Sequence, residues 1–248
     1  MSENILFNDK FPLSSGYNSD WVINNAMGIN PLWLTEWICK NLDLKPNMRV
    51  LDLGSGKAIS SIFLAKEFGV KVWSYDLWIN ATDNLQRIKE ENLENMVFPI
   101  HGDARNLPFA EGFFDVIISI DSFIYYGTED LYLNYLQKFI VPEGQIGIVV
   151  PGLMKEFVDG VPDHLKDFWG QDCWSWHTIH WWRELWERTG LVDIQSSEIL
   201  FDGCNLYVRW KEAQDKMGKN PWPKDIDILK KDAGEYVGFI SLIAKRKS

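Results

Sequence analysis

One short stretch, residues 50–58, constrains the fold of this chain more than any other; it reads V-L-D-L-G-S-G-K-A. An apolar run typical of a buried β-strand ends at two closely spaced glycines, Gly54 and Gly56, and a helical pattern of apolar residues follows from Ile59. A strand that stops at a glycine-rich turn and continues as a helix lets a nucleoside lie against bare backbone. The stretch therefore predicts a strand–helix unit with a nucleoside-binding turn.

An acidic residue occurs where such a site needs one. Residues 70–75 form a second strand-like run, and Asp76 ends it, 22 positions after Gly54 (76 minus 54). This is close to the ~20 residues that separate the glycines from a carboxylate that binds ribose hydroxyls. Position 59 is Ile59, where the dinucleotide pattern G-x-G-x-x-G has its third glycine. A ligand without a pyrophosphate is therefore favoured over a dinucleotide.

Strand and helix patterns alternate from residue 45 onward. A helix over 31–41, capped by Asn30, precedes them, and Thr128 is expected to cap a helix that ends before Pro142. The alternation predicts an α/β fold with an open, doubly wound, mostly parallel seven-stranded sheet. The expected strands are 49–53, 71–75, 96–101, 115–120, 145–150, 192–200 and 236–244, and the other expected helices are 57–68, 81–91 and 178–189.

Two kinds of segment depart from this alternation. Residues 1–44 are expected to form an N-terminal arm and a cap helix. Residues 45–248 are expected to form one ligand-binding domain with insertions at about 151–178 and 201–234. The first insertion is rich in tryptophan, since six of the 13 Trp residues lie between Trp169 and Trp186.

Charge and composition exclude several classes of function. A net charge of −10 argues against nucleic acid as a partner, because phosphates need a basic surface. No apolar run approaches the ~20 residues of a membrane span, and the N-terminus has no signal-peptide pattern. The three cysteines form neither a disulfide framework nor a metal motif, so a cytoplasmic protein without a metal site is expected.

Three motifs together resemble class I S-adenosylmethionine-dependent methyltransferases, notably the small-molecule branch around the ubiquinone and menaquinone methyltransferases. They are residues 50–58, the pair Tyr75-Asp76, and H-G-D-A-R-N-L-P-F (101–109) followed by F-F-D-V-I-I-S. The likeness covers about residues 45–150 and implies a Rossmann-like fold with an antiparallel last strand. The chain departs from the family at Ala58, where a third glycine is common.

The resemblance implies S-adenosyl-L-methionine as the cofactor and residues that would hold it. Asp52 would organise the glycine turn, Asp76 would accept both ribose hydroxyls, and Asp103 would accept the adenine amino group. The full set of expected cofactor residues is Asp52, Gly54, Ser55, Gly56, Asp76, Leu77, Asp103, Ala104, Ser119 and Ile120.

The acceptor pocket is expected beyond the carboxyl ends of the strands, under the N-terminal arm and the Trp-rich insertion. Aromatic rings bind cations and flat apolar groups, so an amine or an aromatic acceptor would fit. His177 and Tyr125 are candidate catalytic residues, and Tyr126, Trp174 and Trp176 are candidate substrate contacts. A packing role for the tyrosines stays open as the alternative.

The expected function is methyl transfer from S-adenosylmethionine to a small-molecule acceptor by in-line displacement. Two alternatives stay open. One is a non-catalytic S-adenosylmethionine-binding sensor or scaffold. The other is a nicotinamide-dependent oxidoreductase, against which the missing third glycine and the Asp103-Ala104 loop both count. The sequence leaves the acceptor atom and the oligomeric state open.

Overall fold

A seven-stranded sheet runs through the computed structural model, which describes residues 5–248. The strand order is β3-β2-β1-β4-β5-β7-β6, and β1 to β5 pair in parallel. β7 is antiparallel to both of its neighbours, which confirms the expected doubly wound sheet with an antiparallel last strand. The strands are β1 (Arg49–Leu53), β2 (Lys71–Asp76), β3 (Val97–His101), β4 (Phe114–Ile120), β5 (Ile140–Leu153), β6 (Val192–Ile199) and β7 (Val237–Arg246).

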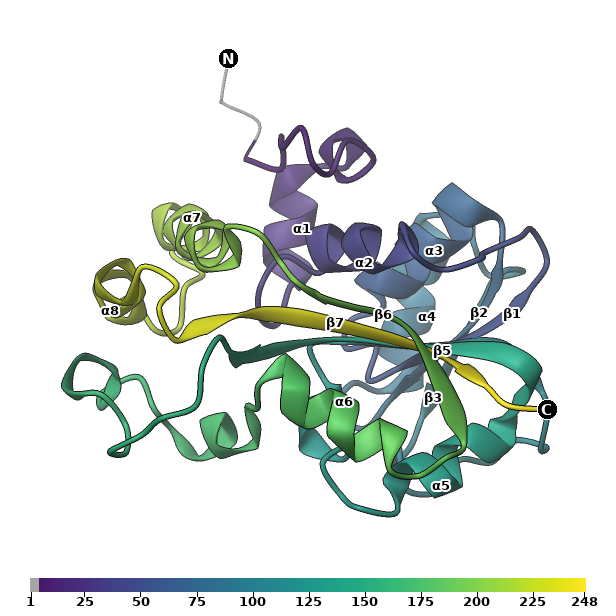
Figure 1. The fold of residues 1–248 in the computed structure, drawn as a ribbon. Coiled ribbons are helices and arrows are strands. Elements are labelled where there is room, and N and C mark those ends of the chain that lie inside the picture. Colours follow the sequence, from purple (N-terminus) through teal and green to yellow (C-terminus); the bar gives the residue numbers. More distant parts are fainter. Residues whose placement is uncertain (1–4) are drawn as a thin grey trace.

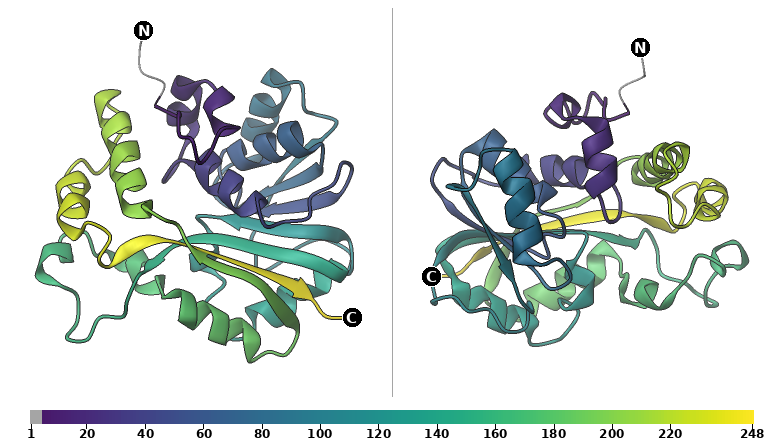
Figure 2. Two further views of the ribbon diagram at one scale, coloured as in Figure 1. Left: turned by 45° about the horizontal axis from the view of Figure 1, so that its top comes forward. Right: turned by 180° about the vertical axis from the view of Figure 1, so that it is seen from behind.

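Helices cover both faces of the sheet (Figures 1 and 2). Trp33 of α2, Ile62 of α3 and Trp210 of α7 belong to the apolar core of one face. Leu133 of α5 and Trp186 of α6 belong to the core of the other face. The helices are α1 (Ser19–Asn25), α2 (Pro31–Cys39), α3 (Ile59–Phe68), α4 (Ala81–Glu90), α5 (Tyr132–Leu136), α6 (Ile179–Glu187), α7 (Gly203–Lys216) and α8 (Asp225–Asp232).

The order of the strands determines where a ligand can bind. The chain leaves β1 towards β2 on one side and later returns to β4 on the other, so the strand order reverses at β1. In open α/β sheets, ligands bind at such a reversal, beyond the carboxyl ends of the strands. Leu53, Asp76 and Ile120 end the three central strands at this edge. Helices on both faces also explain why β1 and β4 are almost continuously buried.

The beginning of the described chain packs onto this core. Leu6 and Phe11 are buried, and the indole N–H of Trp33 donates to the Leu6 carbonyl at 3.2 Å. α2 starts as expected, with Asn30 accepting from the backbone N–H of Leu32 at 3.0 Å and Pro31 at the first helical position. Of the expected N-terminal arm, residues 1–4 lie outside the described residues.

Two expectations about element ends are wrong. Thr128 does not cap a helix: α5 begins only at Tyr132, after Leu131, and it continues as a 3₁₀ turn at residues 137–139. β5 also does not end at residue 150 but continues to Leu153, because Pro151, Gly152 and Leu153 still pair with β7.

The two expected insertions differ in structure. The first contains short 3₁₀ turns at residues 163–165 and 171–175 and ends at Thr178, whose side chain caps α6. The second contains α7 and α8, which pack against each other beside β7 (Figure 2). None of the helices within residues 5–248 has the length and apolar character needed to cross a lipid bilayer.

Candidate functional site

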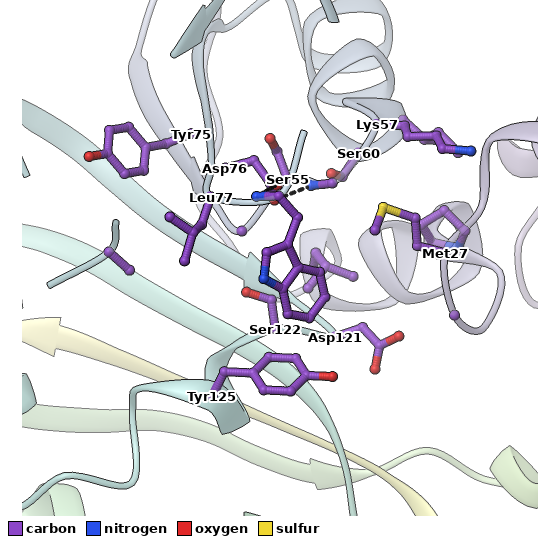
Figure 3. A pocket seen from close by; sticks show the side chains of 18 of the residues that line it. Met27, Ser55, Lys57, Ser60, Tyr75, Asp76, Leu77, Asp121, Ser122 and Tyr125 are labelled. Carbon is purple, nitrogen blue, oxygen red and sulfur yellow. Dashed lines mark hydrogen bonds between the residues drawn. The ribbon is translucent and has the colours of Figure 1, made fainter. Parts of the chain in front are cut away.

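A pocket opens at the carboxyl ends of β1, β2 and β4 (Figure 3). Its volume is about 1050 Å³ when the space at its mouth is included, which is enough for a nucleoside-sized ligand. Its walls come from five segments that are far apart in the sequence. They are residues 25–31, 54–60, 75–78, 102–105 and 120–126.

The glycine turn forms the floor of the pocket. Gly54 and Gly56 both have positive φ, at +77° and +53°. A Cβ atom at Gly54 would lie 1.7 Å from Ser122 Oγ, so only glycine fits there. Ala58 also adopts the left-handed conformation, with φ of +62°. That conformation explains why a glycine suits this position in the family that the chain resembles.

Asp76 ties the glycine turn to the loop after β2. One carboxylate oxygen accepts from the backbone N–H of Gly56 at 2.7 Å. The other accepts from the N–H groups of Trp78 and Ile79 at 2.8 and 2.9 Å. Because an ionised carboxylate has about four acceptor positions, one remains for a ligand. Asp76 lines the pocket and is therefore placed to accept a hydroxyl group.

Asp52 lies beneath the turn and does not line the pocket. One of its oxygens accepts from the hydroxyls of Ser60 and Ser61 at 2.5 and 2.6 Å. The other is buried with no hydrogen-bond partner among the described residues. Burial raises the pKa of Asp52 to about 6, although the two serine hydrogen bonds oppose this shift. Its contacts hold the start of α3 against β1.

The opposite wall contains the third motif. Asp103 lines the pocket, and its carboxylate accepts from the backbone N–H of Arg105 at 2.9 Å. Ala104 is buried at the same wall, and the exposed Leu77 lies beside it in the lining. The Arg105 guanidinium also bonds Glu129 and the carbonyl of Tyr125, so this wall is connected to the loop after β4.

A cluster of hydroxyl groups supports the turn from the β4 side. The hydroxyl of Tyr126 lies 3.0 Å from the Leu53 carbonyl, 3.0 Å from Ser119 Oγ and 2.8 Å from Ser122 Oγ. Burial raises the pKa of Tyr126 far above its usual value. Ser119 is buried and does not line the main pocket, whereas Ile120 and Tyr126 do. Tyr126 thus supports the site through bonds that are already made.

The candidate acceptor residues do not all meet at this pocket. Tyr125 lines it, and its ring packs edge-on against Trp78 at 5.2 Å between centroids. His177 lies outside the pocket lining because its ring stacks on Trp181 at 3.7 Å, where burial lowers the pKa of His177. Trp174 is 66% exposed and also lies outside the lining.

Trp176 lies in a different place from either of these residues. Its ring packs against Phe168 and Trp169, and it lines a small side pocket next to the main one. The side pocket and the main pocket share two lining residues, Ile29 and Asp121.

Asp121 is a site residue that the sequence reasoning missed. It follows β4 directly, with φ of +57°, and it accepts from the backbone N–H of Ile29. In Figure 3 it lies on the Tyr125 side of the pocket, across from Asp76. Burial raises the pKa of Asp121 to about 7. A signal did exist, because Asp121 ends a buried strand at the same sheet edge as Asp76.

Comparison with known proteins shows what this part of the chain is similar to. Residues 50–144 match a family model described as a methyltransferase domain. They include the glycine turn, Asp76, Asp103 and Asp121, so the methyltransferase match covers most of the pocket walls.

Curated relatives of this methyltransferase domain align with part of their length. A glycine/sarcosine/dimethylglycine N-methyltransferase of Actinopolyspora halophila is 28% identical over 42% of this chain and 19% of its own length. A demethylmenaquinone methyltransferase of Corynebacterium efficiens is 33% identical over 44% of each chain. The chain thus spans less than half the length of these relatives.

A solved structure shows that the whole methyltransferase fold is shared. The phosphoethanolamine N-methyltransferase 2 of Haemonchus contortus, solved in complex with S-adenosyl-L-methionine, matches with a TM-score of 0.71. A second structure of that enzyme, in complex with phosphomonomethylethanolamine and S-adenosylhomocysteine, matches with a TM-score of 0.72. In the first complex, 18% of residues are identical, and the match covers 92% of this chain and 56% of that one. At this identity the likeness establishes the fold alone.

Proposed function

We propose that this protein transfers a methyl group from S-adenosylmethionine to a small-molecule acceptor. The observation that carries the proposal is the Asp76 carboxylate at the glycine turn, with one acceptor position left and Asp103 on the facing wall. Carboxylates on two neighbouring loops suit the sugar and the base of one nucleoside. The methyltransferase family supports the same cofactor.

The residues present fit this cofactor. Gly54 leaves backbone bare where a Cβ would collide with Ser122, so a ligand can approach closely. We assign one ribose hydroxyl to the remaining acceptor position of Asp76 and the adenine amino group to Asp103. Leu77 would flank the adenine, Ala104 would donate its backbone N–H to the ring, and Ile120 would contact the methionine part.

When bound, S-adenosylmethionine supplies a methyl group that its sulfonium already activates. The protein therefore has to align the acceptor and to keep water away, rather than to form a covalent intermediate. The N-terminal segment around Met27 and the ring of Tyr125 form partly exposed walls of the pocket, so they would exclude water there. Residues of the hydroxyl cluster, Ser119, Ser122 and Tyr126, would keep the turn in place.

The acceptor class follows from the walls of the pocket and from the relatives. Tyr125, Trp78 and Trp176 provide aromatic surface for an amine or an aromatic ring. Two of the similar proteins given above are named N-methyltransferases, and a third is named a demethylmenaquinone methyltransferase. These names agree with the same two acceptor classes, an amine and an aromatic ring. A cytoplasmic location, expected from the unpaired cysteines, stays a prediction.

Two measurements test the proposed function. Calorimetry should show S-adenosylmethionine binding in the micromolar range, weakened about 100-fold in Asp76→Ala, because a lost buried acceptor of this kind costs a few kcal/mol. Asp103→Ala is the companion variant, since its half-exposed side chain has little weight in folding. Heat with NAD but none with S-adenosylmethionine would favour the oxidoreductase.

Methyl transfer needs its own assay. Labelled S-adenosylmethionine is incubated with the protein and a panel of amines, phenols, thiols and quinones, and the label in the acceptor is counted. Label transfer to any of these supports the proposal. Tight cofactor binding with no transfer to any of them, or to any component of a cell extract, would favour the sensor.

A further inference from the structure

Asp121 is an acidic group that the proposed handling of the cofactor leaves unused. Its side chain lines both the main pocket and the side pocket. Its carboxylate accepts a hydrogen bond from the backbone N–H of Ile29. Its Oδ2 also lies so close to Gly28 that a Cβ atom there would be 2.1 Å away. Within residues 5–248 no Lys, Arg or His side chain pairs with it. A largely buried carboxylate without a cation is costly, so such an arrangement suits a site that receives a cation from outside.

Aromatic residues line the same two pockets as this carboxylate. Burial raises the pKa of Tyr125 to about 12 and also raises the pKa of Tyr207, and the nearby Asp121 carboxylate contributes a smaller rise to both. The side pocket adds the rings of Trp176 and Phe239. A carboxylate among ring faces is the arrangement that binds an ammonium group, through the charge and through cation–π contacts.

The titratable groups around Asp121 do not change this interpretation. Within the described chain, the Asp121 charge acts on two titratable side chains, Tyr125 on the loop after β4 and Tyr207 on α7. Both have pKa values raised by burial, so both stay neutral at physiological pH. From the N-terminal segment only the uncharged Gly28 and Ile29 reach it.

We propose that the methyl acceptor is an amine, which Asp121 binds as its ammonium form and deprotonates before the methyl group is transferred. This proposal rests on the proposed function and names the acceptor class that the pocket would take. The small side pocket, where Ile29, Pro151 and Phe239 provide apolar surface next to Asp121, would receive a small substituent on the nitrogen.

The proton and the bonds balance in this step. An ammonium N–H gives its proton to the Asp121 carboxylate, and the N–H bonding pair becomes the lone pair of the amine. That pair forms the new N–C bond while the C–S bond breaks and its electrons stay on sulfur. The proton then leaves from Asp121 to water. Burial raises the pKa of Asp121 to about 7, which makes it a stronger base than an exposed carboxylate.

Binding of an ammonium group is tested without any turnover. The probes are choline and 3,3-dimethylbutan-1-ol, which have nearly the same shape and differ in charge, titrated into the protein loaded with S-adenosylhomocysteine. We expect choline to bind about tenfold or more tightly than the alcohol. Asp121→Asn should remove this preference. The matched control Asp202→Asn should retain it, because Asp202 also has positive φ but is exposed at the start of α7.

Equal binding of the two probes to the wild type, or a choline preference that survives in Asp121→Asn, would overturn the amine proposal. Thermal unfolding of each variant checks that it is folded, and Asn suits the left-handed conformation that Asp121 adopts.

Methyl transfer provides the second readout. With the labelled donor, amines should be the acceptors in the panel, and Asp121→Asn should transfer at least about 100-fold more slowly while binding S-adenosylmethionine as the wild type does. Transfer to phenols or thiols in preference to amines would refute the amine acceptor and leave the methyltransferase proposal intact. Absence of S-adenosylmethionine binding in the wild type would instead refute the proposed function, whatever choline does.

Discussion

Replacing Asp121 by Asn should stabilise the ligand-free protein, and the gain should depend on pH. The pKa of this carboxyl is about 7 in the folded protein, against an ordinary value of 3.8 that applies to the unfolded chain. The folded state therefore binds the proton more tightly, so the wild type loses stability as the pH rises from about 4 to about 7 and loses no more above that.

The size of the effect follows from this difference. A shift of about three pKa units corresponds to about 4 kcal/mol at one group. Water that enters the open pocket screens the charge, so we expect a difference of about 2–4 kcal/mol. Asn cannot ionise, and its amide oxygen can still accept from the backbone N–H of Ile29. The variant should thus equal the wild type below pH 4 and exceed it at pH 8.

Urea unfolding of the ligand-free proteins at pH 4, 5, 6, 7 and 8 measures the difference in free energy of unfolding between Asp121→Asn and the wild type, by linear extrapolation. Asp52, with a pKa of about 6, titrates in the same range, but it is present in both proteins and cancels in the difference. Asp202→Asn is the control and should stay within about 0.5 kcal/mol of the wild type throughout. A difference that is the same at every pH, or a variant that is less stable at pH 8, would refute the reasoning.

Three further substitutions probe the framework, each by urea unfolding at pH 7. Asp76→Asn should cost about 2–4 kcal/mol, because in either orientation of the amide one set of backbone N–H groups faces another donor; unchanged stability would show that these bonds are dispensable. Gly54→Ala should cost about 3 kcal/mol or more, because its Cβ would collide with Ser122 and its φ is positive. Adding Ser122→Gly to this variant should recover the part of the loss that the collision causes but not the part caused by backbone strain. If the double variant is no more stable than Gly54→Ala, the collision does not cause the loss. Lys211→Met should cost about 3 kcal/mol, because Lys211 is buried and pairs with Asp225 at 2.8 Å, which would be left alone; adding Asp225→Asn should recover part of that loss.

The sheet and its ligand-binding edge could be predicted because short stretches of neighbouring residues determine both. β1 has the expected bounds, and Asn30 caps α2 as the residues around it indicate. A glycine turn between a strand and a helix, with an acid after the next strand, needs no knowledge of distant contacts. The spacing of 22 residues from Gly54 to Asp76 already indicates that Asp76 reaches the turn.

The errors arise where distant contacts override local signals. Pro151 and Gly152 were expected to end a strand, but β7 pairs with them, and a Cβ at Gly152 would lie 2.9 Å from the His177 carbonyl. Thr128 looked like a helix cap, yet the chain makes a turn there first and α5 starts four residues later. Local propensity is a weak guide where the surrounding structure decides the conformation.

The acceptor side of the site was harder to predict for the same reason. Asp121 gains its setting from Gly28 and Ile29, about 90 residues earlier in the chain, and from Tyr207, 86 residues later. His177 and Trp174 were chosen because they lie in an irregular, aromatic segment, and such a segment does not reveal which of its rings face a pocket. The fold places Trp176 at the side pocket, whereas Trp174 and His177 line neither of the two pockets, and no local pattern shows this difference.

The position of β7 has a consequence for how this protein is made. β7 is synthesised after every other strand, yet it lies between β5 and β6, so neither of those edges can be closed while the ribosome is still adding residues before Val237. A nascent chain with two unpaired edges is exposed to pairing with other chains. Release of the last strand therefore completes the sheet in one late step, and a polypeptide stopped before β7 would leave β6 without a neighbour.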